Sequence, residues 1–161
     1  MSTPPLDIYF GDLTHETIGL ATEVFPLNIG YVAAYCLKRH GDAVNVTLFK
    51  SIAELEAAIT DKPPDILALS NYPWCHNTGR EMFRILAELK PEAIRIMGGP
   101  NFPHGADDQA DFLKARPEID AHVYLEGEVP FADIVDLVLT SGELARQALK
   151  TTPVQSCAQL S

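Results

Sequence analysis

The sequence predicts an α/β fold in which five parallel strands form one sheet with helices packed on both faces. Two observations predict it. Short apolar segments, rich in β-branched and aromatic residues, alternate with segments of helical periodicity, and this happens five times along 161 residues. Such alternation implies right-handed crossovers and a parallel sheet. We therefore expect a doubly wound, Rossmann-like (flavodoxin-like) sheet in a three-layer α/β/α arrangement.

The expected strands are short apolar segments bounded by Gly, Pro, Asp or Ser, which is typical of buried strands. They span residues 6–10, 44–49, 65–70, 93–97 and 121–125.

The helices are expected from apolar spacing and from residues that start or stop a helix. Ser51 and Glu54 form a capping box, and the helix they open must end before Pro63. The other expected helices cover residues 27–40, 77 or 78 to 90, 107–115 and 130–139. We expect residues 1–140 to form the domain and residues 141–161 to form a terminal helix and a polar linker.

The composition is that of an ordinary folded domain with a strong acidic bias. Hydrophobic residues make up 47% of the chain, and 12 Lys and Arg against 22 Asp and Glu give a formal net charge of −10. This charge disfavours nucleic acid and anionic membrane surfaces as partners. The sequence shows no signal peptide or spanning segment, so we expect a cytoplasmic protein. The three cysteines, at positions 36, 75 and 157, suit neither a disulfide framework nor a zinc motif.

A ligand of such a sheet binds beyond the carboxyl ends of the strands, so the residues that follow each strand are the candidates for the site. After the first strand come Asp12, Thr14 and His15, an imidazole close to a carboxylate, as in many metal sites. The alternative is that Asp12 and Thr14 only fasten the loop and that His15 is exposed.

The loop after the third strand is dense in functional residue types. Ser70, Asn71, Tyr72, Trp74 and Cys75 offer hydrogen bonds and flat apolar surface that suit a heterocycle with a polar tail. The alternative is a turn whose tryptophan folds back onto the core.

Two further loops add candidates. Gly98 and Gly99 follow the fourth strand and allow close approach of a bulky ligand, or simply make a turn before Pro100 and Asn101. The segment Glu126-Gly127-Glu128 follows the fifth strand, where acidic groups also complement a helix dipole. GxGxxG, GxxxxGK[ST], GxSxG and HExxH motifs are absent from the sequence, so this chain alone is not expected to be catalytic.

Taken in order, four segments resemble the cobalamin-binding domains that precede radical S-adenosylmethionine enzymes. The helix at residues 26–41 is similar to their P-L-G-L-x-Y-L-A-A pattern, and residues 64–70 match P-D followed by apolar residues and a serine. Residues 96–100 give I-M-G-G-P, and residues 124–131 are similar to V-x-G-E-G-E-x-x-F. The resemblance covers residues 6 to about 140.

The resemblance implies a cofactor, cobalamin, held at the strand ends, with its nucleotide tail directed toward Ser70 and close to Gly98 and Gly99. It also implies a radical S-adenosylmethionine domain in cis, methyltransferase-like, that binds S-adenosylmethionine and a four-iron cluster. Its CxxxCxxC motif is absent here, so we expect this chain to be the N-terminal part of a longer protein. The cofactor-binding residues then expected are Asp12, Thr14, His15, Ser70, Asn71, Tyr72, Trp74, Cys75, Gly98, Gly99, Pro100, Asn101, Glu126, Gly127 and Glu128.

The first loop departs from a related pattern. Cobalamin domains of the mutase type carry DxHxxG, whose histidine binds cobalt, and residues 12–19 contain one extra residue in each gap. His15 is therefore a candidate axial ligand, whereas radical S-adenosylmethionine members generally lack this histidine.

Two other functions are compatible with the same strand ends. One is a cobalamin-free domain used for docking or for forming a homodimer, and the other is a flavin or nucleotide binder, although the first loop lacks a phosphate cradle. The feature that separates the first alternative from cobalamin binding is whether Ser70, Gly98 and Gly99 open onto a cavity or are packed shut.

Overall fold

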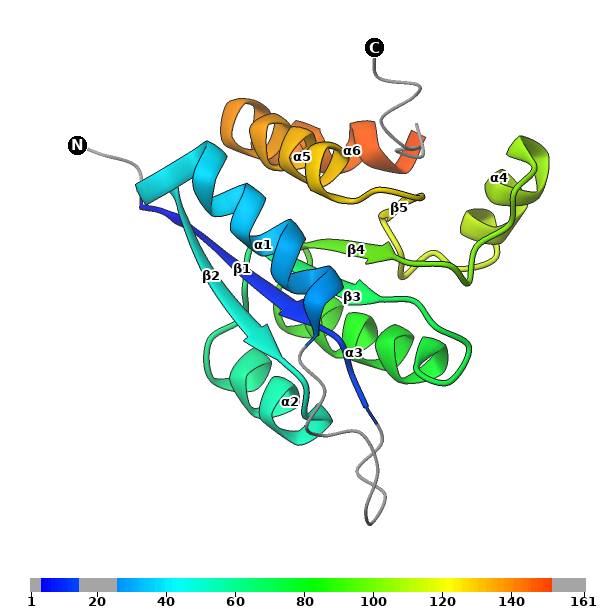
Figure 1. Cartoon of the computed structure of the whole chain (residues 1–161), viewed down its shortest axis with the longest axis horizontal. Coiled ribbons are helices and arrows are strands. Elements are labelled where there is room, and N and C mark those ends of the chain that lie inside the picture. The colour runs from blue at the N-terminus through cyan, green and yellow to red at the C-terminus, as the bar shows by residue number, and fades with distance from the viewer. Residues whose placement is uncertain (1–3, 15–25, 152–161) are drawn as a thin grey trace.

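The computed structural model describes residues 4–14 and 26–151, and within this part the expected doubly wound fold is present (Figure 1). The strands are β1 (Leu6–Gly11), β2 (Val44–Phe49), β3 (Ile66–Ser70), β4 (Ile94–Gly98) and β5 (Ala121–Val123). They form one sheet in the order β2-β1-β3-β4-β5, and every neighbouring pair is parallel. The strand order reverses between β1 and β3, which is where such a sheet binds its ligands.

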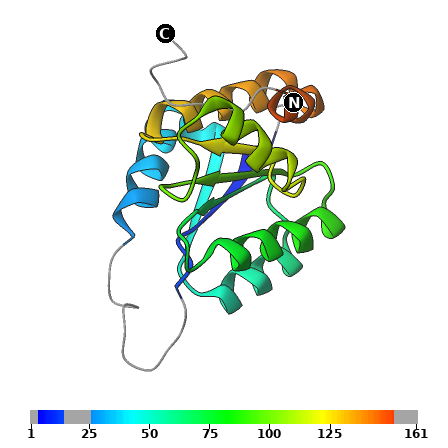
Figure 2. The same ribbon diagram turned by 90° about the vertical axis from the view of Figure 1, so that its right-hand side faces the viewer.

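The helices are α1 (Leu27–His40), α2 (Ile52–Asp61), α3 (His76–Leu89), α4 (Ala106–Lys114), α5 (Glu128–Ser141) and α6 (Glu143–Thr151). Figures 1 and 2 show α1, α5 and α6 over one face of the sheet and α2 and α3 over the other. No helix in the described residues is both long enough and apolar enough to cross a bilayer.

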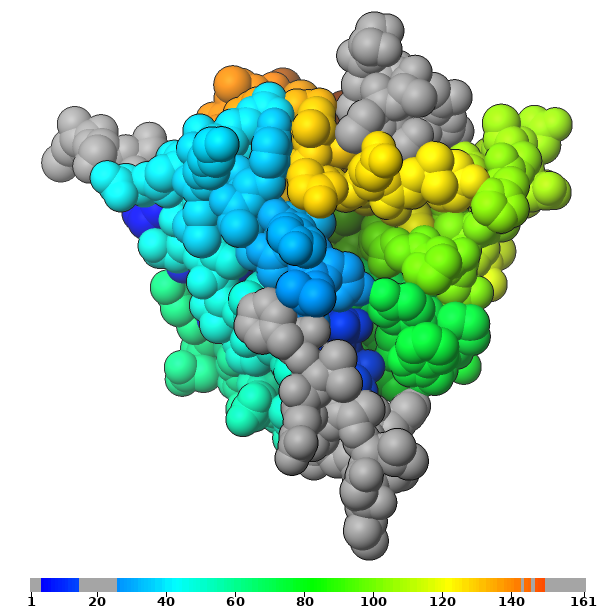
Figure 3. Space-filling model, in the orientation of Figure 1, coloured from blue at the N-terminus to red at the C-terminus, as the bar shows by residue number. Residues whose placement is uncertain are grey.

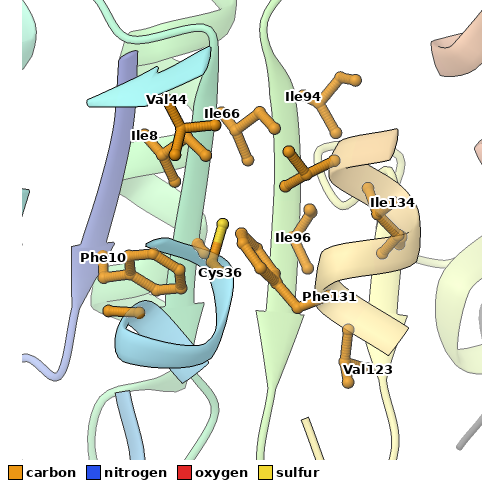
Figure 4. Close-up of a cluster of buried hydrophobic side chains, with 14 of the residues drawn as sticks. Ile8, Phe10, Cys36, Val44, Ile66, Ile94, Ile96, Val123, Phe131 and Ile134 are labelled. Carbon is orange, nitrogen blue, oxygen red and sulfur yellow. The ribbon is translucent and has the colours of Figure 1, made fainter. Parts of the chain in front are cut away.

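Alternating side chains of the strands divide the core into two clusters, because successive residues of a strand point to opposite faces. On the α1 side, Ile8, Phe10, Ile66 and Ile96 pack with residues of α1 and α5 (Figure 4). Ala145 and Leu149 of α6 belong to this same cluster. Tyr9, Leu67, Leu69 and Met97 face α2 and α3 in the second cluster.

The short edge strand β5 is fastened by a buried ion pair. Arg95 of β4 donates from Nε to Asp120 Oδ2 and from Nη2 to Asp120 Oδ1, both at 2.8 Å. Because both side chains are almost fully buried, the two charges satisfy each other and fix the start of β5 beside β4.

Two helix starts differ from the sequence-based expectation by two residues or more, and α4 begins one residue early, at Ala106. α3 begins at His76 rather than after Asn77 or Thr78, because the backbone N–H groups of Cys75 and His76 both bond to the Tyr72 carbonyl and start the helical turn early. α5 begins at Glu128 rather than Pro130, and the backbone N–H of Phe131 bonds to the Gly127 carbonyl there. By contrast, the capping box was correct: the Glu54 N–H donates to the Ser51 hydroxyl at 3.4 Å.

Candidate functional site

A cavity of about 300 Å³ lies at the carboxyl ends of the strands, between the sheet and the helices α1 and α5. Figure 3 shows the surface hollowed between α1 and the segment that leads into α5. Its inner wall is apolar, formed by Phe10 of β1, Ile96 of β4, Val123 of β5 and Phe131 of α5. The Phe10 and Phe131 rings pack 4.7 Å apart between centroids, so this wall is continuous with the core.

The floor of the cavity contains the two glycines that follow the fourth expected strand. A Cβ added to Gly98 would meet only Val123, at 3.7 Å and beyond, so the absent side chain leaves room on the cavity side. Gly99 has φ of +128°, and a Cβ there would lie 3.0 Å from the Asn71 carbonyl oxygen. The lack of a side chain at Gly98 therefore leaves space for a ligand, whereas position 99 must be glycine because of its positive φ and its close approach to the Asn71 backbone.

Ser70 ends β3 and lines the cavity beside these glycines. Its hydroxyl is hydrogen-bonded to the Asp12 carboxylate. Burial raises the pKa of Asp12, and the Ser70 bond and the Lys50 charge oppose that increase. Because a carboxylate only accepts, Ser70 donates to it, and its own oxygen can still accept a hydrogen bond.

Asn71 is fully buried and does not line the cavity. Its Nδ2 donates to the Asn101 carbonyl at 2.7 Å and to His122 Nε2 at 3.1 Å. Its Oδ1 accepts from His76 Nδ1 at 2.8 Å and from Asn101 Nδ2 at 3.1 Å. All the bonding positions of the amide are thus used within the protein, and Asn71 joins the loop after β3 to the loop after β4.

His122, which accepts one of these bonds, is a buried neutral imidazole. It stacks on Phe102 with centroids 3.8 Å apart, and its Nδ1 lacks a hydrogen-bond partner among the described residues. Burial lowers the pKa of His122 to about 3. Burial also lowers the pKa of His76, helped by the nearby charge of Arg116, whose Nε donates to His76 Nε2 at 3.1 Å.

The aromatic residues after β3 point outward rather than onto the core. Tyr72 lines the cavity, and its hydroxyl accepts from Asn28 Nδ2 of α1 at 2.6 Å. Trp74 is exposed and stacks on Tyr72, with ring planes 3° apart and centroids separated by 4.7 Å. Cys75 is instead buried, with Sγ 3.3 Å from the Ser70 carbonyl oxygen, and burial raises the pKa of its thiol.

The loop between β5 and α5 forms the rim of the cavity. Leu125, Glu126, Gly127 and Glu128 all line it. A Cβ added to Gly127 would lie 3.0 Å from Val32 Cγ2, so glycine lets this loop pack against α1. Leu125 has φ of +64°, and no other described non-glycine residue has a positive φ.

The structure thus brings seven of the expected site residues to one cavity: Ser70, Tyr72, Gly98, Gly99, Glu126, Gly127 and Glu128. Asp12 contacts the site through Ser70, whereas Thr14, Asn71, Trp74, Cys75, Pro100 and Asn101 are not among the lining residues. His15 lies outside the described residues. Among the described residues, no group of three or more His, Cys, Asp or Glu side chains could hold a metal ion.

Several lining residues were not expected from the sequence. Asn28, Ile29, Tyr31 and Val32 come from the first turns of α1. Helical periodicity places Ile29 and Val32 on the apolar side of this helix, which indicates only a core face, and Asn28 and Tyr31 do not belong to that apolar set. Tyr31 is 62% exposed, and periodicity does not predict that exposure.

The sequence matches the B12 binding domain family over residues 17–135, which is more than half of the chain. The chain belongs to this B12-binding domain family. A 90-residue stretch is 36% identical to 2-(S-pantetheinyl)-carbapenam-3-carboxylate methyltransferase of Streptantibioticus cattleyicolor. A stretch of equal length is 30% identical to the cobalamin-dependent radical SAM methyltransferase TokK of Streptomyces tokunonensis. Each alignment covers 56% of this chain but 12% of the relative.

The cavity of this B12-binding domain is consistent with part of a cobalamin molecule. Pockets of about 300–1,000 Å³ hold drug-sized ligands, and cobalamin, with its corrin ring and nucleotide tail, is larger than these. The cavity, at about 300 Å³, lies at the lower end of that range, so it is large enough for part of a cobalamin molecule rather than for the whole of it. Ser70, Gly98 and Gly99 open onto it rather than being packed shut, which disfavours the cobalamin-free alternative.

Proposed function

We propose that this B12-binding domain holds cobalamin with the nucleotide tail inside the cavity and the corrin ring at its mouth. The observation that carries the proposal is the space above Gly98, where an added Cβ would meet only Val123. A mostly apolar cavity with glycines in its lining suits a flat heterocycle that must approach the backbone closely.

The residues of this chain would act by positioning and by excluding water. Phe10, Ile96 and Phe131 provide an apolar wall for the heterocycle, and the Ser70 hydroxyl, oriented by Asp12, offers an acceptor oxygen to the tail. Cobalamin when bound supplies a cobalt atom able to carry a methyl group. We infer that the domain serves a cobalamin-dependent radical SAM methyltransferase, by analogy with the named relative. S-adenosylmethionine and a four-iron cluster would belong to a separate domain in cis.

His15 is the candidate cobalt ligand within this proposal. It follows β1 by a few residues, and a neutral imidazole is a good ligand for transition metals. The reason for proposing it is that it follows Asp12 in the loop after the first strand, as in DxHxxG, although residues 12–19 contain one extra residue in each gap of that pattern.

Titration with two corrinoids tests the position of the tail. Purified protein is titrated with hydroxocobalamin and, in parallel, with cobinamide, which lacks the nucleotide tail, and bound corrinoid is separated by gel filtration. We expect cobalamin to migrate with the protein and to bind more tightly than cobinamide. Equal affinity for the two would contradict a tail held in the cavity, and the absence of any binding would contradict the proposed function.

Electron paramagnetic resonance of the bound Co(II) form tests the axial ligand separately. A nitrogen ligand splits the cobalt lines, and this splitting is expected in the wild type and lost in His15→Ala. An unsplit wild-type spectrum would show that His15 does not bind cobalt, without bearing on the position of the tail. Lys114→Ala, which alters an exposed residue of α4 that does not line the cavity, serves as the control variant.

A further inference from the structure

Leu125 combines three properties that are unusual together. Its φ of +64° lies in the left-handed region, which a residue with a branched side chain adopts only under constraint. The residue lines the cavity, and yet it is 66% exposed. A leucine placed in this way gains little from burial in the folded domain, so its own packing does not explain the strained backbone.

The loop on both sides of Leu125 is firmly held. Before it, the Tyr124 hydroxyl is hydrogen-bonded to His104, and Val123 belongs to the paired strand β5. After it, Gly127 packs against Val32, and its carbonyl accepts the N–H of Phe131 at the start of α5. Leu125 therefore lies in a short loop between β5 and α5 that is held at both ends, and these contacts impose its backbone conformation.

Tyr31 faces the same cavity from α1 and is 62% exposed. Figure 3 shows that α1 and the segment leading into α5 are the two sides of the hollow. Two residues with large apolar surface thus line the cavity and are at the same time mostly exposed to solvent. Such side chains lose their contact with water when a ligand with apolar faces covers the mouth.

We propose that Leu125 is a ligand-contact residue, held by the strained loop over the mouth so that it packs on the apolar surface of the bound corrinoid. This inference rests on the proposed function and adds to it one residue whose side chain increases the affinity for the corrinoid. In the free protein the held ends of the loop keep the backbone strained and the leucine exposed, and a bound corrinoid would cover that exposed side chain.

The test compares stability with affinity in the same variants. Leu125→Gly and Leu125→Asn suit a left-handed backbone and remove the apolar side chain. We expect both variants to be at least as stable as the wild type in urea unfolding, and to bind hydroxocobalamin about tenfold more weakly, because most of one leucine side chain is no longer covered. Leu144→Asn, which alters a 70% exposed leucine of α6 that does not line the cavity, is expected to leave the affinity unchanged.

Two outcomes overturn the inference. If both Leu125→Gly and Leu125→Asn unfold more easily than the wild type, the leucine acts by packing within the domain, because an effect of glycine on the unfolded chain would be confined to the first variant. If both variants bind hydroxocobalamin as tightly as the wild type, Leu125 does not touch the corrinoid. Absence of hydroxocobalamin binding by the wild type is a different result, because it overturns the proposed function itself.

Discussion

Gly98→Val places a side chain where the nucleotide tail is proposed to lie. Gly98 ends β4, and a Cβ there meets only the Val123 carbonyl oxygen and Cβ, at 3.7 and 3.8 Å, which are ordinary contacts. A Cβ at this position therefore fits without displacing the protein, and the methyl groups of valine are expected to extend into the cavity. The free domain should fold normally, and since β-branched residues favour strands, its free energy of unfolding is expected to rise by up to about 1 kcal/mol.

The same substitution is expected to weaken cobalamin binding strongly. Forcing extra atoms into a filled site costs about 1–3 kcal/mol. Since about 1.4 kcal/mol is a factor of ten, the dissociation constant should increase roughly 5- to 150-fold. The affinity for cobinamide, which has no tail, is expected to change far less, so the difference between the two corrinoids should shrink.

Absorbance titration with both corrinoids, together with urea unfolding of the free protein, measures these effects. Gly98→Ala provides a smaller step in the same direction, and Ala57→Val adds bulk on the exposed side of α2, away from the cavity. A Gly98→Val protein of wild-type stability that binds cobalamin with wild-type affinity would refute the reasoning, because the tail could then not pass over Gly98.

Three further predictions concern the scaffold of the site. Gly99→Ala is expected to destabilise the fold by about 1–3 kcal/mol in urea unfolding, because its φ of +128° and the Asn71 backbone at 3.0 Å exclude a Cβ; unchanged stability would contradict this. Asn71→Ala should lower the free energy of unfolding by roughly 3 kcal/mol in the same measurement, because His76 Nδ1 and His122 Nε2 lose the hydrogen bonds that they make with the Asn71 amide. A loss below ~1 kcal/mol would show that water replaces the amide. The His122 pKa of about 3, against about 6.5 unfolded, means that the unfolded chain binds more protons between these values, so stability falls as the pH is lowered through that range. Between pH 6.5 and pH 5 this loss is about 2 kcal/mol, and His122→Gln is expected to reduce it; equal pH dependence in both proteins would exclude His122 as the cause.

The sheet and the position of the candidate site follow from local properties of the sequence. Each strand is a short apolar segment with turn residues at its end, and in a parallel sheet these ends meet at one edge. This is why Ser70, Gly98 and Gly127, far apart in the chain, were all correctly expected at the same place. That these residues contact cobalamin stays a prediction.

Neighbouring residues of the same loops have different roles that only the tertiary structure decides. Ser70 lines the cavity, whereas Asn71, one residue later, is buried, and its side-chain amide makes all of its hydrogen bonds to His76, Asn101 and His122. The sequence presented both as polar residues after a strand. The four bonds of the Asn71 amide depend on where α3 begins and where the loop after β4 passes, and neither is a local property.

The difference between what the sequence predicts and what the tertiary structure decides is clearest at the rim of the cavity. The sequence determined that a loop with Glu126, Gly127 and Glu128 follows β5 and starts a helix. It did not indicate that Leu125 adopts φ of +64° or that Tyr31 of α1 faces the same opening. Periodicity and turn chemistry describe contacts within a few residues, whereas exposure and backbone strain arise when β5, α1 and α5 are packed together and each limits the others.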